Sequence, residues 1–231
     1  MRSIENVIKE IKKLYSQGFR GFMFEDDMSL INKEWFLKFS KSILKNKIKI
    51  TYSLQTRVDC IDKEISKALS KSGCVFMYFG IESGVQRILD MCNKKITLNQ
   101  AKNAFKIVKK YGIKAMASIQ FGLPGEDIIN LSTVKETIRF LNKELKPEEV
   151  AISYTCLYPS SPLSIQQEVI CESYEKEIIS NIDKKIYKKT AHGSHSIHPK
   201  DLTPEKIEEI ENTLSKELKI KRFKVETFYK V

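Results

Sequence analysis

Two apolar runs in the middle of the chain constrain its fold more than any other feature. The first, residues 75–84, closes in a charged turn, and the second, residues 113–121, leads into the turn at residues 122–126. Each run is short, bounded by glycine or proline, and apolar without alternation, which is typical of a strand buried on both faces of a parallel sheet. Ligands of α/β folds bind at the carboxyl ends of such strands. The sequence therefore predicts two neighbouring strand ends that serve one ligand.

The rest of the chain alternates between strand and helix patterns. Further strands are expected at residues 19–24, 48–54 and 150–157, and the order is a helix, then strand–helix four times, then a strand. This alternation predicts an α/β fold with a parallel sheet. Five strands before residue 160 are too few for an eight-stranded barrel, so we expect a partial (incomplete) TIM-type parallel βα barrel. Residues 1–163 form this barrel, and residues 164–231 are expected to form a helical C-terminal extension packed on it.

Several helix boundaries follow from capping patterns. Asn32, Asp59 and Thr97 each precede an apolar stripe of helical period, and Thr97 begins a capping box. A long helix is expected over residues 128–141. Thr203 followed by proline predicts the start of a last helix, and the tail beyond it is read as a short strand or an extended arm.

Charge and hydropathy limit the class of protein. The net charge is +11, and only six of the 40 basic residues are arginine. Lysine is spread over every predicted helix, without an arginine cluster or interleaved aromatic residues, so a solvated exterior is favoured over a nucleic-acid surface. The sequence shows no apolar signal region and no window of about 18 uncharged apolar residues. We therefore expect a soluble, cytoplasmic protein with no membrane segment.

The cysteines and histidines give little support for a metal site. The five cysteines are scattered, which excludes a CxxC zinc motif and any close-spaced cluster motif within this chain. We interpret them as reduced thiols, mostly in the core. Three histidines spaced by three residues could chelate a metal ion, but the loop around them has no acidic support, so this hypothesis is less favoured. The residues concerned are Cys60, Cys74, Cys92, Cys156 and Cys171, and His192, His195 and His198.

Charged residues gather where strands are expected to end. Glu25, Asp26 and Asp27 directly follow a predicted strand. Three acidic residues in a row are more than helix capping requires. They are candidates to bind an amine or a metal ion. Arg57 follows the next strand and either holds a carboxylate through its two-pronged guanidinium or pairs with Glu82 or Asp27 as scaffold. Both readings stay open.

The ends of the two central runs suit a nucleoside. Glu82 and Ser83 place a carboxylate beside a hydroxyl, a combination that can bind the vicinal hydroxyls of a ribose. Residues 122–126 would present backbone groups and an apolar wall to a flat ring. The alternative is an ordinary loop, with Glu126 in the first turn of the next helix, where the dipole favours an acid.

Together these motifs resemble the radical S-adenosylmethionine (SAM) superfamily. The branch that includes cobalamin-binding radical enzymes and tRNA methylthiotransferases is the most similar. The similarity covers residues 1 to about 163 and is weaker around residues 203–229. It rests on Phe24-Glu25-Asp26-Asp27, Arg57-Val58-Asp59, Gly80-Ile81-Glu82-Ser83-Gly84 with Asn93-Lys94 downstream, Phe121-Gly122-Leu123-Pro124-Gly125-Glu126, and Tyr158-Pro159-Ser160-Ser161-Pro162.

The resemblance implies a partial six-stranded barrel with SAM lying across the strand ends. It places the acids at residues 25–27 near the methionine amino group and Glu82 and Ser83 at the ribose. The turn at residues 121–123, after the fifth strand of the family barrel, would lie against adenine. Arg57 matches an arginine near the methionine carboxylate, and Tyr158 belongs to the last matching motif. The cofactor-binding residues implied are Glu25, Asp26, Asp27, Arg57, Glu82, Ser83, Phe121, Gly122, Leu123 and Tyr158.

One departure from the family limits the functional prediction. Members of the family carry CxxxCxxC, whose thiolates hold a four-iron four-sulfur cluster, and this chain has no such triplet. We expect the chain to be the barrel portion of a radical SAM enzyme for methyl or methylthio transfer or related chemistry. It should be inactive unless a preceding segment or a partner chain supplies the first strand and the cluster ligands, and cobalamin would bind in a domain outside this chain.

Two other functions remain as alternatives. A cluster-free, degenerate barrel could act as a nucleotide- or RNA-binding module. An unrelated βα-barrel enzyme could use the acidic strand ends as a magnesium site, and this is the least favoured reading.

Overall fold

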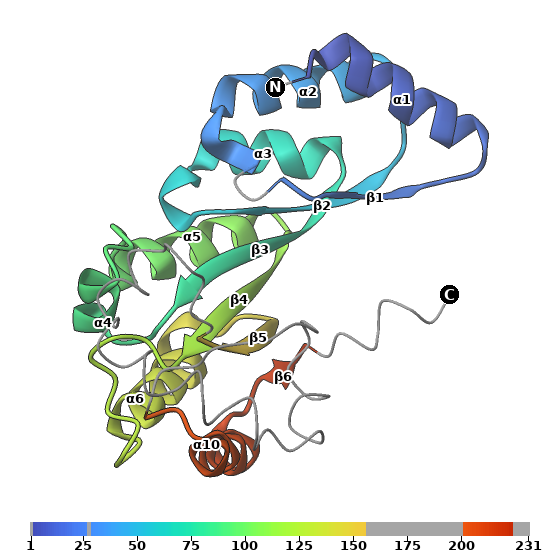
Figure 1. Ribbon diagram of the computed structural model, residues 1–231. Coiled ribbons are helices and arrows are strands. Elements are labelled where there is room, and N and C mark those ends of the chain that lie inside the picture. Colours follow the sequence, from blue (N-terminus) through green and yellow to red (C-terminus); the bar gives the residue numbers. More distant parts are fainter. Residues whose placement is uncertain (1, 27–28, 156–200, 224–231) are drawn as a thin grey trace. The chain divides into compact units, whose positions relative to one another are not determined.

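The computed structural model describes residues 2–26, 29–155 and 201–223 (Figure 1). The chain divides into two compact units, and each is described by itself. Unit 1 consists of residues 1–81, 96–118 and 145–150, and unit 2 of residues 82–95, 119–144 and 151–231.

The strands follow one another across a six-stranded sheet in chain order, β1-β2-β3-β4-β5-β6. β1 pairs with β2 and β2 with β3 in parallel, with Phe24 opposite Leu54 and Leu54 opposite Met77. A helix follows each of β1 to β5. The predicted fold class, a parallel α/β sheet of the incomplete-barrel type, is confirmed in element order and strand order. The strands are β1 (Gly21–Phe24), β2 (Thr51–Thr56), β3 (Cys74–Glu82), β4 (Lys114–Phe121), β5 (Glu149–Tyr154) and β6 (Lys221–Arg222).

Helices cover one face of the unit 1 strands. The Phe24 ring meets Phe39 of α2 edge to face at 5.4 Å, and Phe39 meets Tyr52 at 5.7 Å. The buried Tyr52 hydroxyl lies 2.7 Å from the Ser72 hydroxyl of α3. These aromatic pairs bury a large apolar area, which is the main source of stability for the unit. The helices are α1 (Ile4–Ser16), α2 (Lys33–Lys45), α3 (Lys63–Ser72) and α5 (Leu98–Lys110), with the 3-10 turns η1 (Ser29–Ile31) and η2 (Val58–Cys60).

The capping predictions are confirmed at two of three positions in unit 1. Asn32 caps α2, and Thr97 forms the expected capping box on α5. The prediction for Asp59 was wrong, because the chain first makes the 3-10 turn η2 and α3 is capped by Asp62, whose side chain accepts a hydrogen bond from Ile65 N. Asp59 is thereby left outside the helix.

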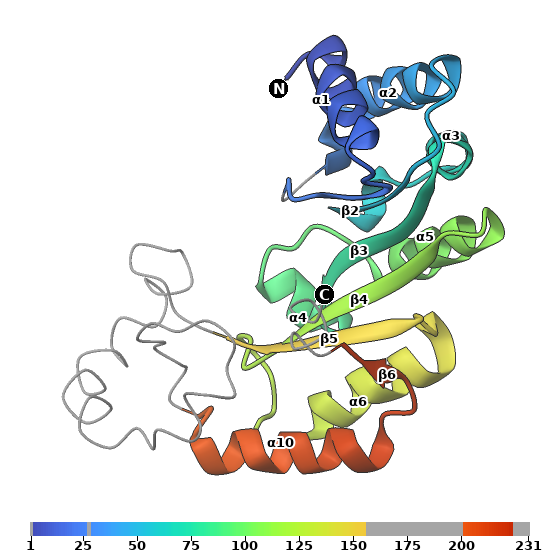
Figure 2. The same ribbon diagram turned by 90° about the vertical axis from the view of Figure 1, so that its right-hand side faces the viewer.

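Unit 2 packs α6 beside α10, as Figures 1 and 2 both show. Asn142, just after α6, donates from Nδ2 to the carbonyl of Glu217 at 2.8 Å. Thr203 caps α10, as expected from the sequence. At the sheet, Glu211 of α10 accepts hydrogen bonds from the Tyr154 hydroxyl and from Arg222, which fixes α10 against β5 and β6. The helices are α4 (Gln86–Met91), α6 (Ser132–Phe140), the π-helical turn η3 (Leu141–Leu145) and α10 (Pro204–Glu217).

The helix expected over residues 128–141 begins later than predicted. Leu131 has a left-handed φ of 57°, which interrupts a helix at that point. The Asp127 carboxylate accepts hydrogen bonds from Asn130 N and the Ser132 hydroxyl. This turn competes with the helix, so α6 starts at Ser132. The expected helical segment at residues 164–190, the domain boundary at 163/164 and the three histidines lie outside the described residues.

Candidate functional site

An ion pair at the end of β3 is the most clearly built feature of unit 2. Lys94 Nζ donates to Glu82 Oε1 at 2.7 Å, and both side chains are 23% exposed. Glu82 has a left-handed φ of 70°, and Asn93 and Lys95, on either side of Lys94, have φ of 52° and 55°. Non-glycine residues in this region are strained and are retained where the surrounding structure or a function requires them. The backbone on both sides of the pair is therefore held to bring the two charges together.

The next two residues are fixed by packing. Ser83 is fully buried, and its hydroxyl accepts a hydrogen bond from Val85 N at 3.2 Å. Gly84 N donates to Thr137 Oγ1 of α6 at 3.1 Å, and a Cβ at Gly84 would lie 2.7 Å from the Thr137 Cα. Gly84 is thus required for the close approach of α6. The predicted contact of Ser83 with a ribose stays a prediction.

Glu126 closes the turn that follows β4. Its Oε2 accepts hydrogen bonds from Gly122 N at 2.6 Å and Leu123 N at 3.2 Å, and its Oε1 is buried without a hydrogen-bond partner among the described residues. Burial raises the pKa of Glu126 to about 7, although the two N–H groups favour the charged form. The alternative that placed Glu126 in the first turn of the next helix was wrong, because α6 begins six residues later.

The short helix α4 braces the same turn. Arg87 Nη1 donates to the Gly125 carbonyl at 2.6 Å. Gly125 has a φ of 80°, which favours glycine, and a Cβ there would collide with the sulfur of Met91. Beneath this contact, Ile88 belongs to a small apolar cluster with Leu123. The turn is therefore held both by its own carboxylate and by the neighbouring helix.

Cys92 connects the two features. Its side chain packs against the apolar cluster of α4 and is intermediate in exposure. Burial raises the pKa of the Cys92 thiol, and the negative charges of Glu126 and Glu82 add to this effect, while Lys94 opposes it. Both carboxylates thus act on one thiol. The end of β3 and the turn after β4 form one local cluster within unit 2.

The apolar residues predicted at this turn belong to the core. Phe121 is fully buried with its ring centroid 6.5 Å from that of Tyr154, and Leu123 is 8% exposed. Gly122 has a φ of 89°, and a Cβ there would approach a methyl group of Leu202 to 2.6 Å. The conformation of the turn is therefore set from within the unit. Contact of these residues with adenine stays a prediction.

In unit 1, two of the three predicted acids are described. Glu25 and Asp26 directly follow β1 and are exposed. The Asp26 carbonyl accepts a hydrogen bond from the Ser29 hydroxyl at 3.3 Å, which begins the 3-10 turn η1. Asp27 lies outside the described residues. The position of these acids at a strand end agrees with the sequence prediction, and their ligand stays open.

Arg57 is held by a neighbour in its own loop. Its Nε and Nη2 donate to the two carboxylate oxygens of Asp59 at 2.9 and 2.8 Å. The two side chains are 26% and 31% exposed. This geometry shows a scaffold pair between Arg57 and Asp59, and Asp27 lies outside the described residues. The two-pronged pair fixes the guanidinium plane at the end of β2.

The structure therefore brings some of the predicted residues together within unit 2. Glu25, Asp26 and Arg57 belong to unit 1. That they bind one ligand together with the predicted residues of unit 2 stays a prediction. Tyr158 lies outside the described residues. The predicted residues brought together in unit 2 are Glu82, Ser83, Phe121, Gly122 and Leu123.

Sequence reasoning missed several residues that build the unit 2 cluster. Lys94 was noted only as part of a motif, and the roles of Arg87 and Thr137 were not foreseen. A helical position for Glu126 was only the alternative reading of this turn. The available signal was the run of charge after α4, but the partner of Lys94 lies twelve residues earlier in the chain, and such pairing is decided by the turn conformation.

The described cysteines do not suit an iron–sulfur cluster. Cluster ligands are thiolates, and burial raises the pKa of Cys60, Cys74 and Cys92, that of Cys74 to about 12. In the described part of the chain, no three His, Cys, Asp or Glu side chains gather in a way that could hold a metal ion. The residues present therefore do not fit this group, and Cys156 and Cys171 lie outside the described residues.

The cluster around Glu82 does fit part of a nucleoside. A half-buried carboxylate held by Lys94 is a preorganised acceptor for hydroxyl groups. The N–H groups of Gly122 and Leu123 are already bonded to Glu126. The turn therefore offers a ligand few N–H donors.

None of the described helices is both long and apolar enough to cross a membrane.

Comparison with known proteins gives a consistent result. The profile of the radical SAM superfamily matches residues 1–141. An uncharacterised methyltransferase of Pyrococcus horikoshii is 33% identical over 162 residues, which cover 70% of this chain and 34% of that protein. An anaerobic magnesium-protoporphyrin IX monomethyl ester cyclase of Rubrivivax gelatinosus is 28% identical over 148 residues, covering 63% and 27%. The chain thus spans about a third of the length of these relatives.

Solved structures share the fold. A radical SAM methyltransferase of Kitasatospora setae, solved with cobalamin and a 4Fe-4S cluster bound, matches 74% of this chain and 34% of its own with a TM-score of 0.67 and 18% identity. A cobalamin-dependent SAM radical enzyme matches 93% of this chain and 32% of its own with a TM-score of 0.52 and 17% identity. At this identity the likeness concerns the fold alone. From the profile match and the identity with the Pyrococcus horikoshii relative, the chain belongs to the radical SAM superfamily.

Proposed function

We propose that this chain is the SAM-binding barrel portion of a radical SAM enzyme for methyl transfer or related radical-driven chemistry. Membership of the superfamily and a methyltransferase among the relatives support this. When bound, SAM would supply the activated methyl or 5′-deoxyadenosyl group. The proposal concerns the binding of the cofactor by this chain and its place in such an enzyme.

The observation that carries the proposal is the Glu82–Lys94 pair. Glu82 would accept hydrogen bonds from the ribose hydroxyls. Lys94 would hold the carboxylate in position and offset part of its charge. In unit 1, Glu25 and Asp26 are the proposed partners of the methionine amino group, with Asp27 following them in the sequence. Each contribution can be tested by its own variant.

Calorimetry with S-adenosylhomocysteine tests the binding function. Glu82→Ala should weaken binding at least about tenfold, because it removes charge-assisted hydrogen bonds worth about 1.5–3 kcal/mol. Lys94→Met should weaken it by a smaller factor, because the acceptor remains without its support. Glu208→Ala, an exposed acid on α10 of the same unit, is the matched control. Affinity unchanged by Glu82→Ala would refute the assignment of this site.

We further propose that the iron–sulfur ligands come from outside residues 1–231, from another segment or a partner chain that also adds the first strand of the family barrel. The described thiols do not suit a cluster, and β1 stands at the end of the strand order. A strand at the end of a sheet has backbone groups available for pairing. Four irons retained by this chain alone would contradict the proposal.

A nucleotide-binding module without radical chemistry is the second candidate. The raised pKa of every described thiol favours it. Under this function, S-adenosylhomocysteine and adenosine should bind with similar affinity. Under the first function the amino acid part of the ligand should contribute, and Glu25→Gln together with Asp26→Asn should remove that difference.

A further inference from the structure

Two neighbouring helices of unit 1, α3 and α5, are rich in lysine. α5 contains four lysines and no acidic residue. In α3, Lys63, Lys67 and Lys71 recur every four residues, and the one acid of the helix, Glu64, is paired with Lys33. The sequence showed lysine on every helix. In α5 no acid accompanies it, and the one acid of α3 is paired with a lysine of α2.

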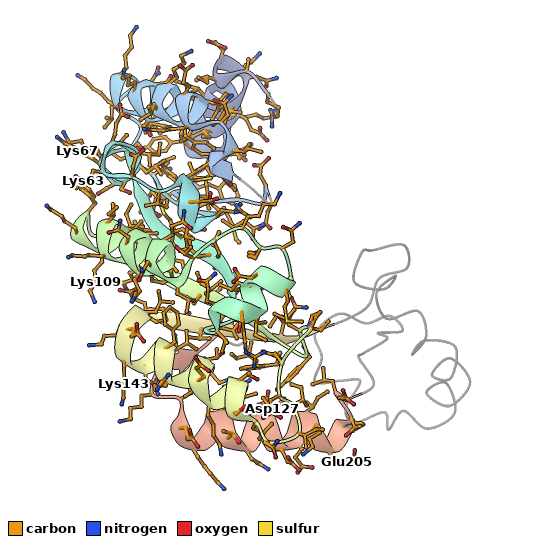
Figure 3. All side chains as sticks on the ribbon, turned by 90° about the vertical axis from the view of Figure 1, so that its left-hand side faces the viewer. Lys63, Lys67, Lys109, Asp127, Lys143 and Glu205 are labelled. Atoms are coloured by element: carbon orange, nitrogen blue, oxygen red, sulfur yellow. The ribbon has the colours of Figure 1, made fainter. Side chains whose placement is uncertain are left out.

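Packing brings the two helices together. α3 and α5 lie side by side, and the Ser70 hydroxyl donates to the carbonyl of Tyr111, at the end of α5, at 2.7 Å. Their buried faces point to the core, so their lysines project outward, as Figure 3 shows for Lys63, Lys67 and Lys109. The exposed lysines form what we call the α3–α5 lysine face: Lys63, Lys67, Lys71, Lys106, Lys109 and Lys110.

This arrangement lowers the stability of the helices. Lys63 with Lys67, Lys67 with Lys71, and Lys106 with Lys110 are like-charged pairs four residues apart, each of which costs about 0.2–0.5 kcal/mol. Lys63 also occupies the first turn of α3, where the helix dipole opposes a positive charge. The dipole favours lysine only in the last turns. The charge of this face is therefore not explained by the folding of its own helices.

The outer helices α1 and α2 provide a contrast. α1 contains two acids, and Glu10 pairs with Arg2 at 2.6 Å. In α2, Glu34 lies 3.7 Å from Lys38, four residues away. Positive charge on these helices is partly offset locally. On the α3–α5 lysine face, by contrast, α5 has no acid and the acid of α3 is paired with α2.

We propose that the α3–α5 lysine face binds the phosphate backbone of a double-stranded nucleic acid, without reading its sequence. Lysine binds phosphate as a point charge, and charge complementarity selects a polyanion. The exposed large hydrophobic side chains of the described residues lie outside α3 and α5. The face therefore lacks the rings on which single strands stack and the apolar anchors that enter lipid.

The dimensions of the face agree with a duplex. α3 has 10 residues and α5 has 13, which correspond to lengths of about 15 and 20 Å. At about 3.4 Å per base pair, the face covers roughly four to six base pairs. A probe of about 20 base pairs is long enough to bind at this face.

Fluorescence anisotropy with labelled DNA and RNA duplexes of one mixed sequence tests the proposal. Between about 50 and 200 mM KCl, log affinity should fall against log salt with a slope of about −3.6 to −5.4, as expected for four to six neutralised phosphates on B-DNA. A second sequence of the same length should bind equally. Binding that is absent, or independent of salt, would overturn the proposal.

A pair of triple variants locates the surface. Lys63→Gln, Lys67→Gln and Lys106→Gln together should make the slope shallower by about two to three and weaken binding at least about tenfold at the lowest salt concentration. Lys9→Gln, Lys13→Gln and Lys41→Gln change the net charge equally on α1 and α2 and should leave affinity within about twofold. An equal loss in both triple variants would show that only total charge matters, which contradicts the proposal.

Two further measurements distinguish duplex binding from a structural role of these lysines and from lipid binding. The melting temperature of the first triple variant should equal or exceed that of the wild type, because repulsion is removed; a clear fall would indicate a structural role. Vesicles containing phosphatidylserine should not bind the wild type more tightly than they bind this variant. Affinity for S-adenosylhomocysteine should not change, so this inference and the proposed function can fail independently.

Discussion

Burial, more than hydrogen bonding, sets the pKa of Glu126. The carboxylate receives two backbone N–H groups, yet its pKa is raised to about 7 because one oxygen is buried without a partner among the described residues. Glu82, by contrast, has a cationic neighbour and an accessible position. Two carboxylates in one cluster thus differ in their surroundings: Glu82 is paired with a cation, and Glu126 shapes the turn.

The free energy of unfolding should depend on pH through Glu126. Its pKa is 4.5 in the unfolded chain and about 7 in the folded one, so the folded state binds the proton more tightly. This contribution to stability is fully present below pH 4.5 and is lost as pH rises to about 7, a change of about 3 kcal/mol. Urea denaturation at several pH values should show that Glu126→Gln removes this decline.

The control for this experiment is Glu208→Gln, at an exposed acid of α10. The difference in unfolding free energy between Glu126→Gln and the wild type should grow in favour of the variant from pH 4.5 to 7.5, whereas the difference for Glu208→Gln should stay flat. A constant difference for Glu126→Gln would show that the group titrates normally in the folded state.

Among the elements, α6 depends on one glycine. Gly84 approaches α6 so closely that an added Cβ would lie 2.7 Å from the backbone of Thr137, and its N–H donates to Thr137 Oγ1. Helix and turn are therefore coupled through backbone contact. Backbone cannot rotate away as a side chain can, which makes this contact intolerant of substitution.

Gly84→Ala should lower the free energy of unfolding by about 1–3 kcal/mol or more, because the overpacked helix must move. Thermal melting followed by circular dichroism would measure it. Gly21→Ala is the matched control, since the nearest atom to an added Cβ there is 3.9 Å away. Equal melting temperatures for the two variants would contradict the predicted role of this contact.

For the molecule as a whole, a prediction concerns the described cysteines, which do not suit an iron–sulfur cluster. Anaerobic reconstitution with iron and sulfide should leave far less iron than the four atoms per chain of a complete cluster, because the described thiols are buried or have raised pKa values. Iron and sulfide analysis after gel filtration would measure this. The control replaces all five cysteines with serine.

The wild type and the serine variant should retain the same small amount of iron. A stoichiometric cluster in the wild type that disappears in the variant would show that residues of this chain, including those outside the described ranges, provide the ligands. That result would place the cluster within residues 1–231.

Local sequence patterns predicted most elements, since the spacing of apolar residues dictates which face of a helix or strand is buried. The helices capped by Asn32, Thr97 and Thr203 and the strands β1 to β5 follow from such patterns. Boundaries were wrong where two local interactions compete. Asp62 replaced Asp59 as the cap of α3, and the turn at Asp127 delayed α6, because side-chain hydrogen bonds to nearby N–H groups stabilise alternatives to the helix.

The sequence by itself determined the parallel α/β architecture and the position of the charged residues at strand ends, because both depend on interactions between near neighbours. Only the tertiary structure decided which charges meet: Glu82 with Lys94, Arg57 with Asp59, and Glu126 with the backbone of its own turn. Such pairing depends on turn conformation and burial. It also brought the lysines of α3 and α5 onto one face, since helix packing, and not order in the chain, places those residues beside each other.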